Sequence, residues 1–246
     1  MAQRGSPTKQ LRVAAAATVL LSLLIVVGGG VVRLTGSGLG CPDWPKCTGG
    51  SLAPTQQLSW HATVEYTNRL LTVLLCVGIG VFIILSWLHL GLRDRITKSG
   101  FLQMAIVVLN AVVGGVSVWT GLNPWIVAGH FVAAMLLVMT AAISFELVQL
   151  RAGSATPRIS RTMPRAILIL TGVVVVIGTL VTGSGPHSGD ADALHRMPFD
   201  WIGVTIVHGA AAGLLIIVAL IYAAGFAPTR VMRSHRRRAM IFLLLL

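Results

Sequence analysis

Two histidines stand near the beginnings of long apolar segments that hold few other polar side chains. His130 follows Trp125 by five residues, and His208 follows Trp201 by seven. Tryptophan is enriched at the membrane–water interface, and a helix rises about 1.5 Å per residue, so both imidazoles are expected within roughly 7–11 Å of one interface. Ionisable side chains at that depth are costly, which makes them candidates for function. We interpret the pair as ligands of a cofactor; histidines that only hydrogen-bond one helix to another are the alternative.

A second polar group occurs in the segment Glu65-Tyr66-Thr67-Asn68-Arg69. In a helix, Glu65, Asn68 and Arg69 stand at i, i+3 and i+4 and share one face. That face is expected to point inward, because lipid would penalise it. The alternative is a Glu65–Arg69 pair that neutralises itself at the interface. His61 precedes Glu65 by four residues and shares its face if the helix begins early.

Cys41 and Cys47 lie close together in one polar segment, Cys41-Pro42-Asp43-Trp44-Pro45-Lys46-Cys47. On the outer side of a membrane an oxidising compartment permits a disulfide, which is the interpretation we favour. Two free thiols, or a metal pair lacking further partners, are the alternatives, although no Cys-x-x-Cys spacing suggests a metal. Cys76 is expected only to pack.

The composition of the chain indicates which kind of helix must position these residues. The chain of 246 residues is 55% hydrophobic and 11% charged, with a mean hydropathy of +0.84, which excludes a soluble globular domain. Apolar segments long enough to cross about 30 Å of hydrocarbon as helices lie near 13–32, 70–90, 101–120, 125–149, 166–183 and 201–225. A seventh begins near 239 and is expected to be cut short at Leu246. The sequence therefore predicts an all-α, polytopic membrane helical bundle of six full helices and the start of a seventh.

The net charge of +12 is distributed as a topology signal rather than as a nucleic-acid surface. The loops alternate between basic and weakly charged, and Arg33, Lys46, Arg69 and Arg196 are the only basic residues on the weakly charged side. By the positive-inside rule, the N-terminus is cytoplasmic. The basic groups are Arg4, Lys9 and Arg12; Arg93, Arg95 and Lys98; Arg151, Arg158, Arg161 and Arg165; and Arg230, Arg233, Arg236, Arg237 and Arg238.

A Thr-Gly-Ser-Gly motif occurs twice, at Thr35 and Thr182, 147 residues apart. Four predicted helices separate the copies, so both face outward and the repeat is parallel rather than inverted. We expect two four-helix halves, residues 1–150 and 151–246, with the second half incomplete.

Polar residues deeper in the apolar segments are expected to serve packing. Gln103 and Asn110 are predicted to hydrogen-bond to neighbouring helices. Glu146 lies about 24 Å along a helix from His130, near the opposite surface, where it is expected to pair with Arg151.

Together these motifs resemble heme A synthase. The matching segments are Arg33–Gly38, the cysteine-bearing loop, Glu65–Arg69, Thr120–Trp125 leading to His130, and Gly178–Asp190 leading to His208. The resemblance covers nearly the whole chain. It implies eight helices in two four-helix halves, and oxidation of the C8 methyl group of heme O to a formyl group.

The resemblance also implies roles for individual residues. His208 would be an axial ligand of a prosthetic heme b in the second half, and His130 a ligand at the site of the substrate, heme O, in the first half. Glu65 would be the catalytic carboxylate of that site. The heme propionates would pair with Arg33, Arg69 or Arg196. The implied location is a bacterial plasma membrane, with the synthase that makes heme O and an unidentified electron donor as partners, and a homo-oligomer is possible.

Two departures from the family pattern affect these expectations. The family usually has a histidine where this chain has Asn68, and an amide is a poor iron ligand. Asn68 is therefore expected inside the first-half pocket without binding iron, with His61 as an alternative donor. The second departure is the missing eighth helix, which would supply the partner of His208, and without which the chain is expected to hold heme b poorly.

Two other classes of protein use similar features. A membrane b-type electron-transfer cytochrome would use the same histidines but would not need a carboxylate beside a replaceable heme. A transporter with parallel repeats would place its polar groups near the midplane of the membrane, on broken helices.

Overall fold

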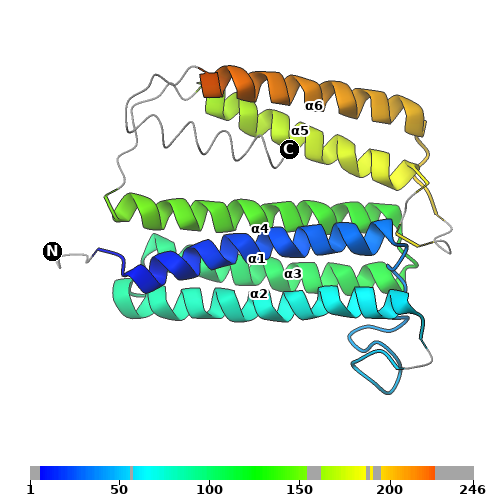
Figure 1. Cartoon of the computed structure of the whole chain (residues 1–246), viewed down its shortest axis with the longest axis horizontal. Helices are drawn as coiled ribbons and strands as arrows, with labels where there is room; N and C mark the ends of the chain where they lie inside the picture. The colour runs from blue at the N-terminus through cyan, green and yellow to red at the C-terminus, as the bar shows by residue number, and fades with distance from the viewer. Residues whose placement is uncertain (1–5, 56–57, 154–161, 187–188, 191–194, 225–246) are drawn as a thin grey trace. The chain divides into compact units, whose positions relative to one another are not determined.

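The computed structural model describes residues 6–55, 58–153, 162–186, 189–190 and 195–224. Within these ranges the chain forms six helices, each long and apolar enough to span a membrane, which confirms the all-α membrane fold (Figure 1). The predicted seventh helix lies outside the described residues, and the parallel repeat stays a prediction. The helices are α1 (Lys9–Leu34), α2 (Trp60–Leu90), α3 (Arg95–Trp119), α4 (Pro124–Arg151), α5 (Thr162–Ser184) and α6 (Trp201–Ala224).

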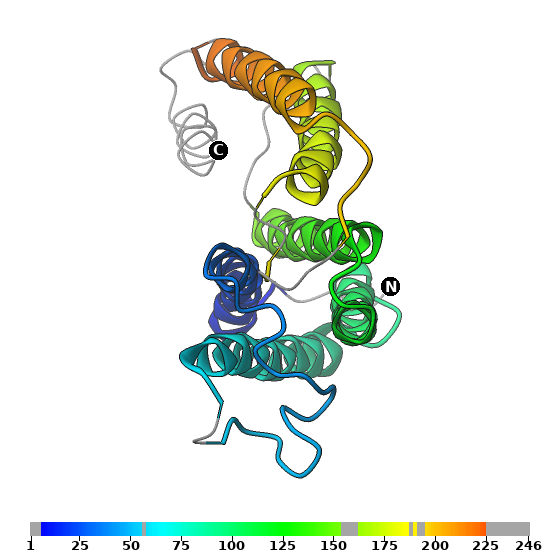
Figure 2. The same ribbon diagram turned by 90° about the vertical axis from the view of Figure 1, so that its right-hand side faces the viewer.

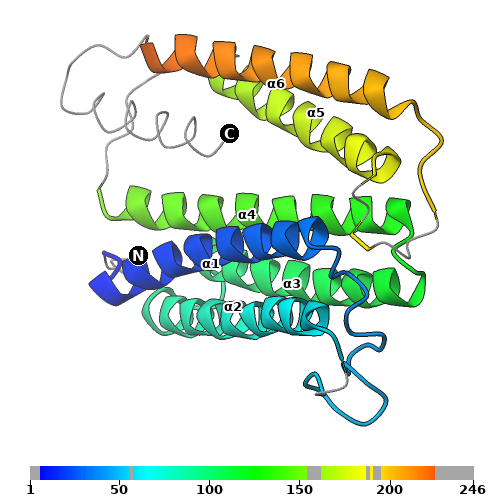
Figure 3. The same cartoon turned by 45° about the vertical axis from the view of Figure 1, so that its right-hand side comes forward.

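The chain separates into two compact units. The first comprises Met1–Gly153 and Gly185–Met197, and the second comprises Ser154–Ser184 and Pro198–Leu246. In the first unit, α1 and α3 each pack against both α2 and α4. The four helices therefore close a ring, which Figure 2 shows from one end of the bundle. In the second unit, α5 packs against α6 (Figure 3). The assignment of one heme to each half stays a prediction.

The helices begin where capping residues satisfy free backbone N–H groups. Thr8 Oγ1 accepts from Leu11 N at 3.2 Å, and Asp94 Oδ1 accepts from Ile96 N at 2.9 Å. Helix α2 begins at Trp60, about ten residues before its apolar segment. In the first turns of α2, Ala62 and Glu65 are buried inside the first unit.

Apolar layers hold the ring of α1–α4 together. One layer takes Leu11, Phe82, Ile96 and Val148 from the four helices in turn. A second layer lies further along the bundle, and its buried members are Leu75, Ile79, Ile83, Val107 and Leu137. Many long apolar side chains point outward instead, which suits contact with hydrocarbon.

The polar packing residues follow the predictions only in part. Gln103 Nε2 donates to Ser144 Oγ of α4 at 2.8 Å, which confirms its interhelical role. The prediction for Asn110 is wrong, because its Nδ2 donates to the Ile106 carbonyl of its own helix. Arg151 donates to Asp94 Oδ2 at 2.7 Å and so joins the end of α4 to the start of α3. The pairing of Arg151 with Glu146 stays a prediction.

Candidate functional site

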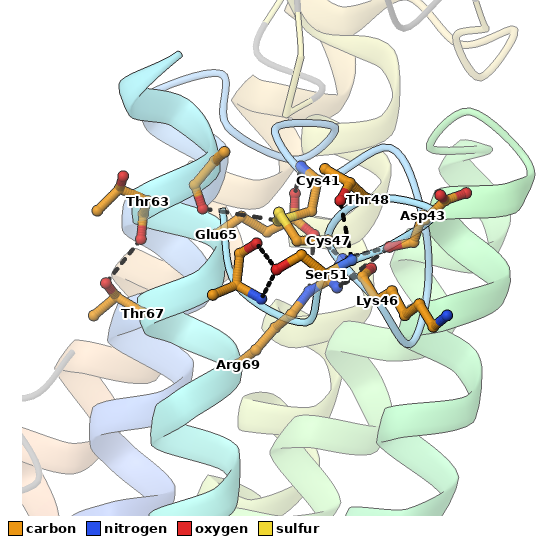
Figure 4. The surroundings of a disulfide bond; sticks show 12 residues. Cys41, Asp43, Lys46, Cys47, Thr48, Ser51, Thr63, Glu65, Thr67 and Arg69 are labelled. Atoms are coloured by element: carbon orange, nitrogen blue, oxygen red, sulfur yellow. Dashed lines mark hydrogen bonds and ion pairs between the residues drawn. A yellow bond between two sulfur atoms is a disulfide. The ribbon is translucent and has the colours of Figure 1, made fainter. Parts of the chain in front are cut away.

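The loop between α1 and α2 is closed by a disulfide between Cys41 and Cys47, as the sequence predicts (Figure 4). Both cysteines are fully buried. They pack on Ala62 in the first turn of α2, with Leu58 and Tyr66 beside them. The short disulfide loop is therefore seated on α2 rather than extended into solvent.

Glu65 holds one edge of this loop. It is buried, and its Oε2 accepts the backbone N–H of Cys41 at 2.8 Å. Its Oε1 accepts from Arg69 Nε at 3.1 Å and pairs with Arg69 Nη2 one helical turn away. A buried carboxylate is tolerated because all these partners are donors.

Arg69 holds the other edge of the disulfide loop. Its Nη1 donates to the carbonyls of Asp43, Pro45 and Lys46 at 3.3, 3.4 and 3.0 Å, and its Nη2 also contacts the Asp43 carbonyl. Figure 4 shows the guanidinium reaching from α2 into the loop. Arg69 thus anchors the loop, and its role toward a heme propionate stays a prediction.

His61 is engaged at the Thr-Gly-Ser-Gly turn. Its Nδ1 lies 3.0 Å from Ser37 Oγ, which in turn lies 2.7 Å from Thr35 Oγ1. Its ring also stacks on Trp60, with 4.0 Å between ring centroids. Seven residues separate His61 from Asn68 on α2, about 10 Å along the helix, so the two side chains stand at different depths.

His130 and His208 share an unusual environment. The Nδ1 atom of each is buried and has no hydrogen-bond partner among the described residues. Each ring packs on a glycine of the preceding helix: a Cβ on Gly114 would lie 3.2 Å from His130 Cε1, and one on Gly178 would lie 3.1 Å from His208 Cε1. Both imidazoles are thus half-buried against bare backbone.

Asn68 fits the same pattern on α2. Its Oδ1 is buried without a partner among the residues that the structure describes, and a Cβ on Gly28 of α1 would overlap it. A buried polar atom without a partner costs about 1–3 kcal/mol. The three side chains are therefore candidates for contact with a bound group.

Glycine positions are the feature of the sequence that marks these environments. A glycine lies on the preceding helix opposite each of the three side chains: Gly28, Gly114 and Gly178. Within the described ranges no three His, Cys, Asp or Glu side chains converge on a metal site. An imidazole can also be a ligand of a cofactor that brings its other metal ligands with it, as a porphyrin does.

Trp44 joins the disulfide loop to α3 beside the His130 position. Its ring lies edge-to-face with Trp119, 5.6 Å between centroids, and covers Gly115, where a Cβ would lie 2.5–2.8 Å from the ring atoms. The neighbouring Gly114 carries the ring of His130. The loop therefore reaches the same stretch of α3 as the candidate ligand.

We expect Gly115→Ala to push Trp44 off α3 and to destabilise the protein by about 1–3 kcal/mol, the usual cost of overpacking. Thermal unfolding in detergent, followed by tryptophan fluorescence, measures the change. Gly80→Ala in α2 is the matched control, because nothing lies within 4 Å of its added Cβ. Equal midpoints for the two variants would show that Trp44 is not packed on Gly115.

Comparison with known proteins shows which family the chain belongs to. It is 34% identical to a heme A synthase of Lysinibacillus sphaericus over 122 residues. This match covers 48% of this chain but only 39% of that relative. The chain is 27% identical over 226 residues to a heme A synthase of Listeria monocytogenes, which covers 84% of this chain and 70% of the relative. A family model, COX15-CtaA, described as cytochrome oxidase assembly protein, matches residues 12–246. The chain belongs to the COX15-CtaA family of cytochrome oxidase assembly proteins.

Proposed function

We propose that this protein is a heme A synthase, a membrane oxidoreductase that converts heme O to heme A. The observation that carries the proposal is the pair of half-buried imidazoles, His130 and His208, whose buried Nδ1 atoms have no partner among the described residues. Membership of the family, and relatives described as heme A synthases, support the same reaction.

The proposed reaction oxidises the C8 methyl group of heme O by two successive hydroxylations. Each takes one oxygen atom from O₂ into a C–H bond and reduces the other to water with two electrons and two protons, the electrons coming from a separate donor. The geminal diol that results loses water and leaves a formyl group. No protein side chain activates oxygen or abstracts hydrogen from an unactivated methyl group, and a bound heme supplies that redox chemistry. The chain's own residues bind and orient the substrate and exclude water.

In this proposal each polar residue has a separate task. His130 binds the substrate heme in the first unit, and His208 binds a prosthetic heme b in the second. Glu65 orients the substrate or holds a proton beside it, as a positioned carboxylate can. Arg69 fixes the disulfide loop above Glu65 and lies where a propionate would find a cation.

The proposed setting follows from topology. The chain lies in a bacterial plasma membrane with its N-terminus in the cytoplasm, because its basic residues gather in the loops of that side. The disulfide loop then faces the oxidising side. A synthase that makes heme O supplies the substrate, and a separate donor supplies the electrons.

Extraction of bound heme from the purified protein, followed by mass spectrometry, tests the proposal. Heme A or hydroxylated heme O is the expected result. Heme b alone would indicate an electron-transfer cytochrome, and a protein without heme would indicate a transporter.

Asn68→His is expected to convert the bound substrate heme to a six-coordinate low-spin form. The new imidazole would stand on α2 beside Gly28, where the amide oxygen of Asn68 now lacks a partner. Absorption and electron paramagnetic resonance spectra measure the spin state. His61→Ala is the companion variant and should leave coordination unchanged, because His61 is bound to Ser37. An unchanged spectrum in Asn68→His would show that Asn68 faces away from the iron.

A further inference from the structure

The loop that follows α5 returns to the first unit and binds the Thr-Gly-Ser-Gly turn there. The Gly38 N–H donates to the Gly189 carbonyl at 2.8 Å, and the Leu39 N–H donates to Asp190 Oδ2 at 3.2 Å. These residues stand about 150 positions apart in the chain. Two consecutive backbone N–H groups are thus held by two consecutive residues of the second loop.

The junction is also closely packed. A Cβ on Gly38 would lie 2.9 Å from both the Gly189 carbonyl oxygen and Leu122 Cδ1, so no larger side chain fits there. Gly189 has φ +111°, a conformation that side chains other than glycine rarely adopt. Leu122, in the turn between α3 and α4, is buried and also has a positive φ of 57°. Three outer loops therefore meet at Gly38.

This junction continues directly into the site of Glu65. Leu39, held by Asp190, lies two residues before Cys41, whose N–H is held by Glu65. The same loop is therefore fixed by one carboxylate from α2 and by another from the loop after α5. Without the hydrogen bond from Leu39 N–H to Asp190, the segment that enters the disulfide loop would be less restrained. The hydrogen bond from Cys41 N–H to Glu65 would then weaken.

We propose that Asp190 is a positioning residue for the first-half site. Its hydrogen bond from Leu39 N–H, which we call the latch, holds the disulfide loop in place over Glu65. Its relevance to heme O rests on the proposed function above, whereas the latch itself does not. The loop that follows the second Thr-Gly-Ser-Gly copy would then serve the site of the first unit through Gly189 and Asp190.

The decisive measurement is the rate at which an impermeant phosphine reduces the Cys41–Cys47 disulfide in the full chain. Both cysteines are fully buried, so reduction requires the loop to open. Loss of a hydrogen bond to a charged group should raise the population of the open loop about tenfold. Asp190→Ala should therefore speed reduction of the disulfide by about the same factor. Asp190→Asn keeps an acceptor oxygen and should retain most of the protection. Asp200→Ala is the matched control: Asp200 Oδ2 also accepts a backbone N–H, from Gly203, but at the start of α6.

Conversion of heme O, measured by mass spectrometry in the same membranes, decides whether the latch positions the site. Asp190→Ala should lower the heme A formed about tenfold, in step with the faster reduction. An Asp190→Ala protein reduced at the wild-type rate would overturn the latch, and faster reduction with full heme A formation would overturn the positioning role.

Failure of the proposed function looks different, because the wild type itself would then form no heme A while Asp190→Ala still exposed the disulfide. Gly189→Ala disturbs the same junction through the backbone, and should match Asp190→Ala if the latch is present.

Discussion

In a form of the protein with all eight helices of the family, His208→Ala is expected to abolish the low-spin heme b spectrum, while His130→Ala should leave that spectrum intact and stop the formation of heme A. The physical reason is that the two imidazoles lie in different units, His130 against Gly114 in the first and His208 against Gly178 in the second. Removal of an axial ligand leaves a heme without its main attachment to the protein. Reduced-minus-oxidised spectra of membranes and extracted heme together measure both effects.

His89→Ala serves as the control for these two variants. His89 is a histidine in the last turn of α2, at the far end of that helix from the disulfide loop. Its replacement should leave both the heme b spectrum and heme A formation unchanged. Loss of both signals in His130→Ala, or in His208→Ala, would contradict the division of tasks between the two units.

Glu65→Gln is expected to reduce the formation of heme A by about 10²–10⁴-fold, the usual contribution of a positioned acid or base. The carboxylate accepts from Cys41 N on one oxygen and from Arg69 on the other, so both oxygens face donors. A glutamine presents an NH₂ group to one of these donors, which leaves an unpaired contact inside a buried site. Quantified heme O and heme A in membranes measure the loss, with Glu146→Gln as the control at the other end of the bundle.

The phosphine reduction rate separates two ways in which Glu65→Gln could act. If Glu65 only seats the loop, heme A formation should fall no further in Glu65→Gln than in a loop variant whose disulfide is reduced equally fast, such as Asp190→Ala. If Glu65 also acts at the substrate, as we propose, heme A formation should fall much further than in that variant. Equal activity at equal reduction rates would reject a chemical role for this carboxylate.

The membrane helices could be predicted from hydropathy because lipid imposes one rule on every spanning segment. The six apolar segments match the six helices, and the errors fall where protein rather than lipid surrounds the helix. The sequence placed Glu65–Arg69 at the start of the second helix, whereas α2 begins at Trp60, five residues earlier. This first turn carries Ala62, on which the buried disulfide packs.

The contacts of individual polar residues could be predicted less well. Helical spacing correctly placed Glu65 and Arg69 together, and the disulfide that we predicted for Cys41 and Cys47 is confirmed. The contacts of Arg69 with three loop carbonyls, and of Asp190 with Leu39, depend on how distant loops fold over one another. No periodicity in the sequence records such contacts, and only the structure shows them.

The formation of heme A in cells that make heme O but have no other heme A synthase tests the central claim most directly. Mass spectrometry of total heme should show heme A when the wild-type protein is produced, and only heme O when His130→Ala is produced at the same level in the membrane. Heme O left unconverted by a correctly inserted wild-type protein, in cells that supply oxygen and electron donors, would contradict the account.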